Sequence, residues 1–385
     1  MPTLSLPTSD RRLQPYTTRA PRSWPTKPAN PFNRVAIAAA HVVADPLADC
    51  DPWIEPRLDW DATLAYRRHL WKLGFGVAEA MDTAQRGMGL DWKTSLELIR
   101  RSVEAAKAEG AMVFSGAGTD HLALGTYSVD QVIGAYEEQI EAIEKLGGRV
   151  ILMASRALAA SARGPEDYAK VYDRILGGLR EKAIIHWLGD MFDPALGGYW
   201  GHRDLDAASE VAVEVIQRNA AKVEGIKVSL LDKDREITMR RRLPRDVRMY
   251  SGDDFNFAEL IAGDEQGYSD ALLGILDAIA PAASAALAAL ARGSRNEFHD
   301  MLAPTVPLSR HIFRAPTRFY KTGIVFMAYL NGHQQHFVMV GGQQSARSIL
   351  HLAELFRLAD QAGLLVDPDR AARRMATVLQ SHGIG

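Results

Sequence analysis

The chain has 385 residues, of which 47% are hydrophobic and 24% charged, the composition of an ordinary globular protein that can bury a large core. Its formal net charge of −2 and the lack of a long basic run argue against nucleic-acid binding. A single cysteine, the absence of an apolar run of roughly 18 residues, and an N-terminus without a signal-peptide core lead us to expect a cytoplasmic protein that does not bind membranes.

Residues 1–33 are rich in proline, serine, threonine and arginine, and they show little helical periodicity. They predict an extension outside the main fold. Two short strand-like runs, residues 4–6 and 13–17, are separated by the turn-forming Thr8, Ser9 and Asp10. These runs fit a short hairpin, and an irregular arm over the surface fits them equally well.

From Arg34 the pattern becomes a recurring unit of buried-type strand, polar loop and amphipathic helix. Eight apolar strand-like stretches recur, at residues 35–43, 76–81, 111–115, 149–154, 183–188, 223–228, 247–251 and 271–275. Two helix starts are clear, because Ser128 and Gln131 have capping-box spacing and Pro165 suits a first turn. Parallel strands need crossover helices, so eight units predict an α/β fold, a closed (β/α)8 TIM barrel over residues 34–302.

Beyond Pro281 the pattern is wholly helical, with expected helices near residues 282–290, 296–302, 321–330 and 345–362. Residues 303–385 therefore predict a C-terminal helical appendage. The glycines at positions 332, 341 and 342 indicate turns. No dinucleotide fingerprint or phosphate-binding loop follows any strand, so we expect no nucleotide and no other cofactor.

The expected strand at residues 223–228 carries one lysine, Lys227, within an apolar run. In a sheet covered on both faces, burying an unpaired ammonium is costly, so such a lysine is neutralised, paired or used chemically. A desolvated lysine is also a nucleophile toward carbonyl groups. The alternative is a lysine on an edge strand that faces water.

Active sites of such barrels lie where the strands end, and seven of the eight expected strands end in ionisable or hydrogen-bonding side chains. The candidate site residues at these strand ends are His41, Asp82, Thr83, Asp120, His121, Arg156, His186, Asp253 and Asp254. Each alone also fits a helix cap or an ordinary buried histidine. Their convergence at one mouth of a barrel nevertheless predicts a site.

The Gly-Ile-Lys-Val-Ser of residues 225–229, followed by Tyr-Ser-Gly-Asp-Asp at 250–254, resembles paired motifs of the dihydrodipicolinate synthase and N-acetylneuraminate lyase family. Residues 270–281 resemble that family's eighth strand and the helix after it, and the strand spacing matches over roughly residues 34–302. The resemblance, to a dihydrodipicolinate synthase-like branch, implies a Schiff base between Lys227 and a keto group. It also implies a homo-oligomer, a dimer or tetramer.

The chain departs from the family pattern around the substrate. The family's proton-shuttling tyrosine on strand five corresponds to His186, which can also transfer protons near neutral pH. The strand-two segment that holds the substrate carboxylate in the family keeps only Thr83, and the neighbouring Asp82 would repel a 2-keto acid. The paired tyrosines after strand four correspond to Arg156 and Ala157, and Arg156 can bind a carboxylate as a bidentate fork.

Carboxylates at the strand ends also suit hydroxyl groups, as in a keto-sugar, with Asp253 and Asp254 contacting the hydroxylated tail. We therefore predict a Schiff-base-forming lyase, an aldolase or dehydratase, that acts on a small keto acid or keto-sugar with Lys227 and His186 as catalytic residues. The predicted substrate-binding residues are His41, Asp82, Thr83, Asp120, Arg156, Asp253 and Asp254.

Two other functions stay open. One is a divalent-metal-dependent sugar isomerase or epimerase, although the sequence has no tight ligand motif and predicts no metal site. Its ligand-type side chains at the strand ends would be His41, Glu79, Asp120, His121, His186 and Asp253. The other is a ligand-binding barrel without activity, since the family's tyrosines are replaced.

The loop at residues 189–203 is long and carries Phe192, Tyr199, Trp200 and His202. A lid over the site is one interpretation. A surface loop that its own aromatic side chains hold in place is the other.

Overall fold

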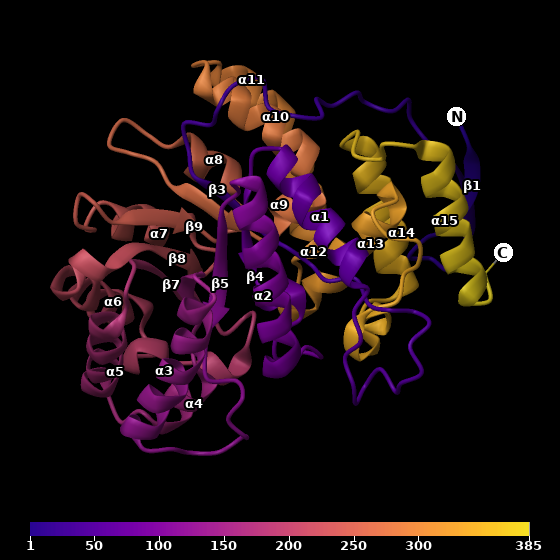
Figure 1. Cartoon of the computed structure of the whole chain (residues 1–385). Helices are drawn as coiled ribbons and strands as arrows, with labels where there is room; N and C mark the ends of the chain where they lie inside the picture. Colours follow the sequence, from indigo (N-terminus) through magenta and orange to yellow (C-terminus); the bar gives the residue numbers. More distant parts are fainter. Residues whose placement is uncertain (385) are drawn as a thin grey trace. The chain divides into compact units, whose positions relative to one another are not determined.

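The computed structural model describes residues 1–384, and eight of its strands, all parallel, close into a barrel in the order β10-β3-β4-β5-β6-β7-β8-β9. The strands are β3 (Ala36–Ala39), β4 (Gly76–Glu79), β5 (Val113–Ala117), β6 (Arg149–Leu152), β7 (Ala183–Leu188), β8 (Val223–Ser229), β9 (Arg248–Ser251) and β10 (Asp270–Leu273). Figure 1 shows them with the helices that follow them. The predicted (β/α)8 barrel is confirmed.

The chain divides into two units. The barrel unit contains residues 34–40 and 76–273, and hence all eight strands. The second unit contains residues 1–33, 41–75 and 274 onward. The predicted division into an extension, a barrel and a C-terminal region stays a prediction.

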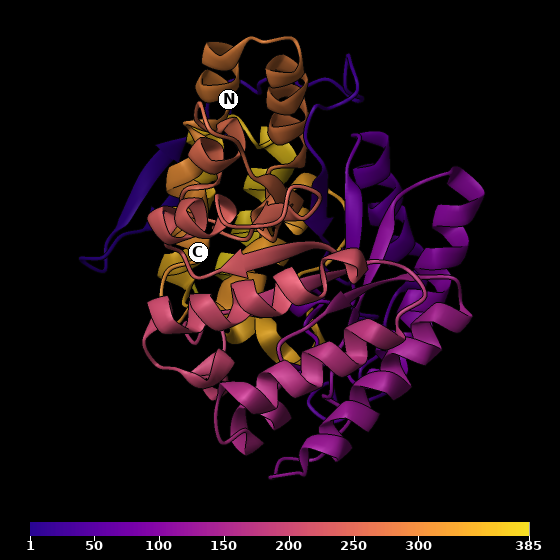
Figure 2. The ribbon, with the colours of Figure 1, turned by 90° about the vertical axis from the view of Figure 1, so that its left-hand side faces the viewer.

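Helices of the barrel unit follow each of the strands β4 to β9, and two of them, α4 and α5, follow β6. They are α2 (Trp92–Glu109), α3 (Val129–Lys145), α4 (Arg156–Ser161), α5 (Pro165–Gly178), α6 (Leu205–Arg218), α7 (Lys233–Arg240) and α8 (Phe257–Ala262). Ser128 and Gln131 form the expected capping box, and Pro165 occupies the first turn of α5. The helices α2, α3, α5 and α6 pack side by side in sequence order (Figure 2).

The barrel interior is filled by alternate residues of the strands, as the pleat requires. One layer of interior side chains is Ile37, Ala39, Ala78, Met81, Phe114, Ile151, Ile184, Tyr250 and Leu272. Lys227 on β8 is in register with Tyr250 on β9 and with His186 on β7. Because partners in register point to the same side of a sheet, Lys227 and His186 also face the barrel interior.

The second unit begins with a hairpin, since β1 (Thr3–Pro7) pairs antiparallel with β2 (Leu13–Thr17). Asp360 anchors the hairpin end by accepting hydrogen bonds from the Tyr16 hydroxyl and from the Arg19 backbone N–H. Its helices are α1 (Trp60–Lys72), α9 (Ile275–Ala278), α10 (Ala280–Ala291), α11 (Arg295–Leu302), α12 (Thr305–Ile312), α13 (Tyr320–Asn331), α14 (Ile349–Gln361) and α15 (Pro368–Ser381). Of these, α12 and α15 were not predicted from the sequence.

Short 3-10 turns complete the described chain. They are η1 (Asp82–Ala84), η2 (Pro194–Leu196), η3 (Tyr199–Gly201), η4 (Ala220–Lys222), η5 (Thr317–Phe319) and η6 (Val340–Ser345). Among residues 1–384, no helix combines the length and apolar character that crossing a membrane requires.

The long loop after β7 is held by its aromatic side chains. Tyr199 and Trp200 are buried, and their rings pack against Tyr168 and Tyr172 of α5. The Tyr199 hydroxyl accepts a hydrogen bond from the backbone N–H of Ser155 and lies 3.0 Å from the Tyr172 hydroxyl. These contacts fit the second interpretation of this loop.

Close approach of β8 to β9 depends on Gly225. A Cβ at this position would lie 2.6 Å from the Arg248 carbonyl oxygen and 2.7 Å from the Tyr250 ring. We expect Gly225→Ala to lower the free energy of unfolding by about 1–3 kcal/mol, because an overpacked core must shift its backbone. Urea unfolding followed by circular dichroism measures the change.

The matched control is Gly177→Ala on α5, where an added Cβ meets no atom within 4 Å. Alanine there should leave stability unchanged or raise it by up to about 1 kcal/mol, because it favours the helix. Equal urea midpoints for Gly225→Ala and the wild type would contradict the tight β8–β9 packing.

Candidate active site

The candidate nucleophile is Lys227, near the carboxyl end of β8. It is 7% exposed, and its aliphatic chain passes close to Gly252, where an added Cβ would lie 3.0 Å from the Lys227 Cε. Among the described residues, no hydrogen bond or ion pair reaches its amine. Burial lowers the pKa of Lys227 below its ordinary value of 10.5, and the carboxylates of Asp82 and Asp254 offset part of this effect.

His186 lies beside Lys227 on β7 and is fully buried. Its Nε2 is 3.2 Å from the Ser229 Oγ, and its Nδ1 has no partner among the described residues. Burial, and then the charge of Lys227, lower the pKa of His186 well below 6.5. The imidazole is therefore neutral at neutral pH and can accept a proton at one nitrogen.

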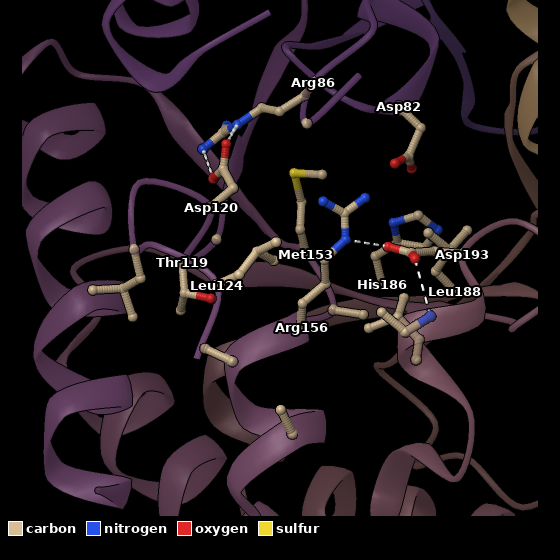
Figure 3. A pocket seen from close by; sticks show the side chains of 18 of the residues that line it. Asp82, Arg86, Thr119, Asp120, Leu124, Met153, Arg156, His186, Leu188 and Asp193 are labelled. Atoms are coloured by element: carbon tan, nitrogen blue, oxygen red, sulfur yellow. Dashed lines mark hydrogen bonds and ion pairs between the residues drawn. The ribbon is translucent and has the colours of Figure 1, made fainter. Parts of the chain in front are cut away.

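A cavity of about 450 Å³ opens beside His186, above the ends of β4 to β7 (Figure 3). This volume is in the ordinary range for a small-molecule site. Its polar and charged lining residues are Asp82, Arg86, Thr119, Asp120, Arg156, His186 and Asp193, and Met153, Leu188 and Leu196 are among its apolar ones. Lys227 is not part of the lining, but it adjoins His186, which is.

One wall of the cavity is an ion pair between Arg86 and Asp120. The Arg86 Nε and Nη2 donate to the two Asp120 carboxylate oxygens at 2.9 and 2.7 Å. Nη2 also donates to the Gln139 side chain, and Nη1 donates to the Gly116 carbonyl at 2.5 Å. Burial alone would raise the pKa of Asp120, but the Arg86 guanidinium holds it below its ordinary value. All three guanidinium nitrogens of Arg86 thus donate hydrogen bonds within the protein.

A second ion pair joins Arg156, the first residue of α4, to Asp193 in the loop after β7. The Arg156 Nε lies 2.5 Å from the Asp193 Oδ2, and the Asp193 Oδ1 accepts a hydrogen bond from the Ala195 backbone N–H. Figure 3 shows the Arg156 guanidinium between the Arg86–Asp120 pair and His186. No other described residue bonds its two terminal nitrogens, so they can still donate to a ligand.

The remaining predicted residues of the barrel unit do not line the cavity. Asp253 accepts hydrogen bonds from the backbone N–H groups of Phe255 and Asn256 and from the Asn256 side chain, so it holds the turn after β9. Asp254 and Thr83 are buried, and Asp254 acts on the charge of Lys227. Their roles in substrate binding stay predictions.

His41 belongs to the second unit. Its Nδ1 lies 2.8 Å from the Asp277 Oδ2, and its backbone N–H donates to the same oxygen. Its ring packs against Tyr66, which in turn contacts His69 and His333. These contacts describe His41 within the second unit, and its role in substrate binding stays a prediction.

The six ligand-type side chains named for a metal-dependent isomerase do not form a metal site in the described part of the chain. There, no three or more histidine, cysteine, aspartate or glutamate side chains are grouped so as to hold an ion. Glu79, for example, lies on the helix side of the sheet, where it accepts a hydrogen bond from the Ser102 hydroxyl of α2 at 2.5 Å.

The sequence did not predict Glu236 of α7, a fully buried carboxyl group behind β9. Its two oxygens are bonded to the hydroxyls of Ser251 and Ser269, at 3.1 and 2.7 Å. Burial raises the pKa of Glu236 to about 8. The hydrogen bond to Ser251 connects this acid to the segment that carries Asp253 and Asp254.

Replacing Glu236 by glutamine should change how stability depends on pH. Because its pKa is raised from 4.5 to about 8, the unfolded chain releases this proton first, and the wild type loses stability as pH rises through that window. From pH 5 to pH 8, the free energy of unfolding of Glu236→Gln should rise by about 3 kcal/mol relative to that of the wild type. Urea unfolding at both pH values measures this gain.

Glu265→Gln, at an exposed position before β10, is the matched control and should follow the wild type at both pH values. A constant difference between Glu236→Gln and the wild type from pH 5 to 8 would mean that Glu236 is ionised throughout.

Solved structures with this fold include a dihydrodipicolinate synthase from Thermotoga maritima, with a TM-score of 0.62 and 16% identity, covering 86% of this chain and 99% of that one. YagE, a prophage protein of E. coli K12 from the dihydrodipicolinic acid synthase family, was solved in complex with pyruvate. It has a TM-score of 0.64 and 11% identity, covering 92% of this chain and 99% of that one. At such identities the likeness establishes the fold alone.

No curated protein matches the chain. One family model, described as "Protein of unknown function (DUF993)", matches residues 4–384.

Proposed function

The chain belongs to the DUF993 family, and we propose that it is a Schiff-base-forming lyase, an aldolase or dehydratase, that acts on a small keto acid or keto-sugar. The observation that carries the proposal is the setting of Lys227. Its amine is buried inside a closed barrel, no described residue bonds it, and its pKa is lowered. An amine in this state is the form that attacks carbonyl carbons.

In the first step the lone pair of the Lys227 Nζ attacks the substrate carbonyl carbon, and the resulting carbinolamine loses water to give an iminium ion. In an aldol cleavage, a base takes the proton of the hydroxyl group on the third carbon, and the carbon–carbon bond breaks. The hydroxyl-bearing fragment leaves as an aldehyde, and the electron pair of the broken bond moves toward the iminium nitrogen to give an enamine. Protonation of the enamine carbon and addition of water then release the ketone product and the free amine.

His186 is the proposed base and acid for these proton transfers. It is in register with Lys227, it lines the cavity, and its imidazole is neutral at neutral pH. The lowered pKa also means that the imidazole, once protonated, gives the proton up readily. The bond between its Nε2 and the Ser229 hydroxyl fixes the orientation of the ring.

Asp82, Asp120 and Arg156 are the proposed substrate-binding residues for which the cavity offers support, since all three line it. His41, Thr83, Asp253 and Asp254 remain proposed on the strand-end pattern. The pyruvate complex of YagE, which has the same fold, agrees with a carbonyl ligand in such a barrel. The reaction needs no cofactor.

We also propose that the protein acts in the cytoplasm as a homo-oligomer, a dimer or tetramer. Its one cysteine, Cys50, is free and partly exposed, which suits a reducing compartment. One solved structure with the same fold is described as the first monomeric dihydrodipicolinate synthase variant. Sedimentation of the full chain would distinguish a monomer from a dimer or tetramer.

Borohydride reduction tests the imine directly. Incubation of the full chain with a panel of ketones that contains hydroxyacetone, dihydroxyacetone and pyruvate, followed by borohydride, should add the mass of at least one reduced ligand to Lys227. Peptide mass spectrometry locates the adduct. Lys227→Ala should lose it, whereas Lys145→Ala, which removes an exposed lysine of α3, should keep it. Folded wild-type protein without an adduct from any ketone would contradict the proposal.

Exchange of substrate protons for deuterium tests the role of His186. The neutral imidazole should take a proton from the carbon next to the imine and return a deuteron from the solvent. His186→Asn should therefore slow deuterium incorporation into hydroxyacetone by about 10²-fold or more. Proton NMR in D₂O follows this reaction. Borohydride trapping at Lys227 serves as the control and should persist in the variant. Unchanged exchange with intact trapping would assign the proton transfer to another group.

A further inference from the structure

The charges around the cavity are not balanced. Of its charged lining residues, Arg86 pairs with Asp120 and Arg156 pairs with Asp193, so these four side chains cancel in two pairs. Asp82 remains, and no described residue gives its carboxylate a hydrogen bond or an ion pair. The cavity lining therefore carries one uncompensated negative charge.

This unpaired carboxylate acts electrostatically on Lys227, the proposed nucleophile. Asp82 opens the turn η1, directly beyond β4, and Figure 3 shows its carboxylate directed toward the cavity, on the His186 side. Buried Asp254 acts on Lys227 in the same way. A carbonyl carbon bonded to the Lys227 amine would thus have its substituents near two carboxylates.

These two carboxylates favour one kind of substituent. A carboxylate on the carbonyl carbon, as in a 2-keto acid, would meet like charges in a partly buried site. A hydroxymethyl group would instead donate a hydrogen bond to a carboxylate, which only accepts them. The same argument applies to further hydroxyl groups along the substrate.

The rest of the cavity does not supply a compensating cation. The Arg86 guanidinium is bonded on all sides by Asp120, Gln139 and the Gly116 carbonyl. Arg156 can still donate from its terminal nitrogens, but Asp193 already neutralises its charge. Such a group can hydrogen-bond hydroxyl oxygens, and the pairing with Asp193 weakens its attraction for an anion.

We propose that the substrate is an uncharged polyhydroxylated ketone whose carbonyl carbon bears a hydroxymethyl group in place of a carboxylate, and that Asp82 is the residue that selects it. This inference rests on the proposed Schiff-base function and specifies its substrate class. It places Asp82 beside the reacting carbon as a hydrogen-bond acceptor, and it places Arg156 as a donor to hydroxyl groups farther along the chain.

Hydroxyacetone and pyruvate provide a matched pair of probes, because both are methyl ketones and they differ only in a hydroxymethyl group against a carboxylate. Cyanoborohydride trapping of the full chain, followed by intact-mass spectrometry, gives a rate of adduct formation for each probe. Each rate is divided by that of the same probe with free Nα-acetyl-lysine. We expect the wild type to favour hydroxyacetone by about ten-fold or more.

Asp82→Asn keeps the shape of the side chain and removes its charge, so it should shift this preference toward pyruvate by about ten-fold or more. Asp246→Asn is the matched control, since this exposed aspartate before β9 lies outside the cavity lining. It should keep the wild-type preference.

The outcomes separate the two proposals. Adducts that form at Lys227 with pyruvate as fast as with hydroxyacetone would overturn the substrate class and leave the Schiff-base function standing. A preference that Asp82→Asn does not change would overturn the role of Asp82. Failure of both probes, in the wild type and in Asp82→Asn, would overturn the Schiff-base function itself.

Discussion

An amine without a bonding partner, enclosed in a barrel of parallel strands, is the constraint on which the rest of the site depends. Lys227 faces the interior because β7, β8 and β9 align it with His186 and Tyr250. Gly252 leaves room for its side chain, and Gly225 allows β8 and β9 to approach. Burial disfavours the charged amine, and Asp82 and Asp254 limit how far its pKa falls.

Four of the charged side chains that line the cavity beside this amine are already paired with one another. Two arginine–aspartate pairs contribute to its walls, and a neutral histidine, in register with Lys227, also lines it. Paired walls keep their shape when a ligand enters, because few of their hydrogen bonds need to be exchanged. The unpaired Asp82 is then the lining group whose interactions depend most on what the ligand carries.

The sequence was sufficient to predict the fold because the signals for it are local. A continuous apolar stretch marks each strand, and the capping box at Ser128 and the first-turn Pro165 define two helix starts. The helix α15, which was not predicted, also begins with a local signal, an aspartate cap at Asp367 followed by a first-turn Pro368. This signal is of the same kind as the one at Pro165.

The site was predictable only in part. Lys227 and His186 follow from strand position, but the side-chain pairs of the other candidate residues join distant parts of the chain. The pairs Arg86–Asp120, Arg156–Asp193 and His41–Asp277 span 34, 37 and 236 residues, and no local pattern predicts such pairings. The burial of Glu236 could not be predicted for a similar reason. A glutamate on a polar helix is typical of the protein surface, and only the packing of α7 against β9 shows that it is buried.

The state of the Lys227 amine is the property from which the proposed function follows, and NMR can observe it directly. In protein labelled with ¹⁵N at the lysine side chains, Lys227→Ala assigns the Nζ signal, and a pH titration of the folded wild type gives its pKa. We expect an inflection below 10.5, the ordinary value for lysine. A pKa at or above 10.5 would contradict the account, because the amine would then be a stably charged ammonium and not a nucleophile.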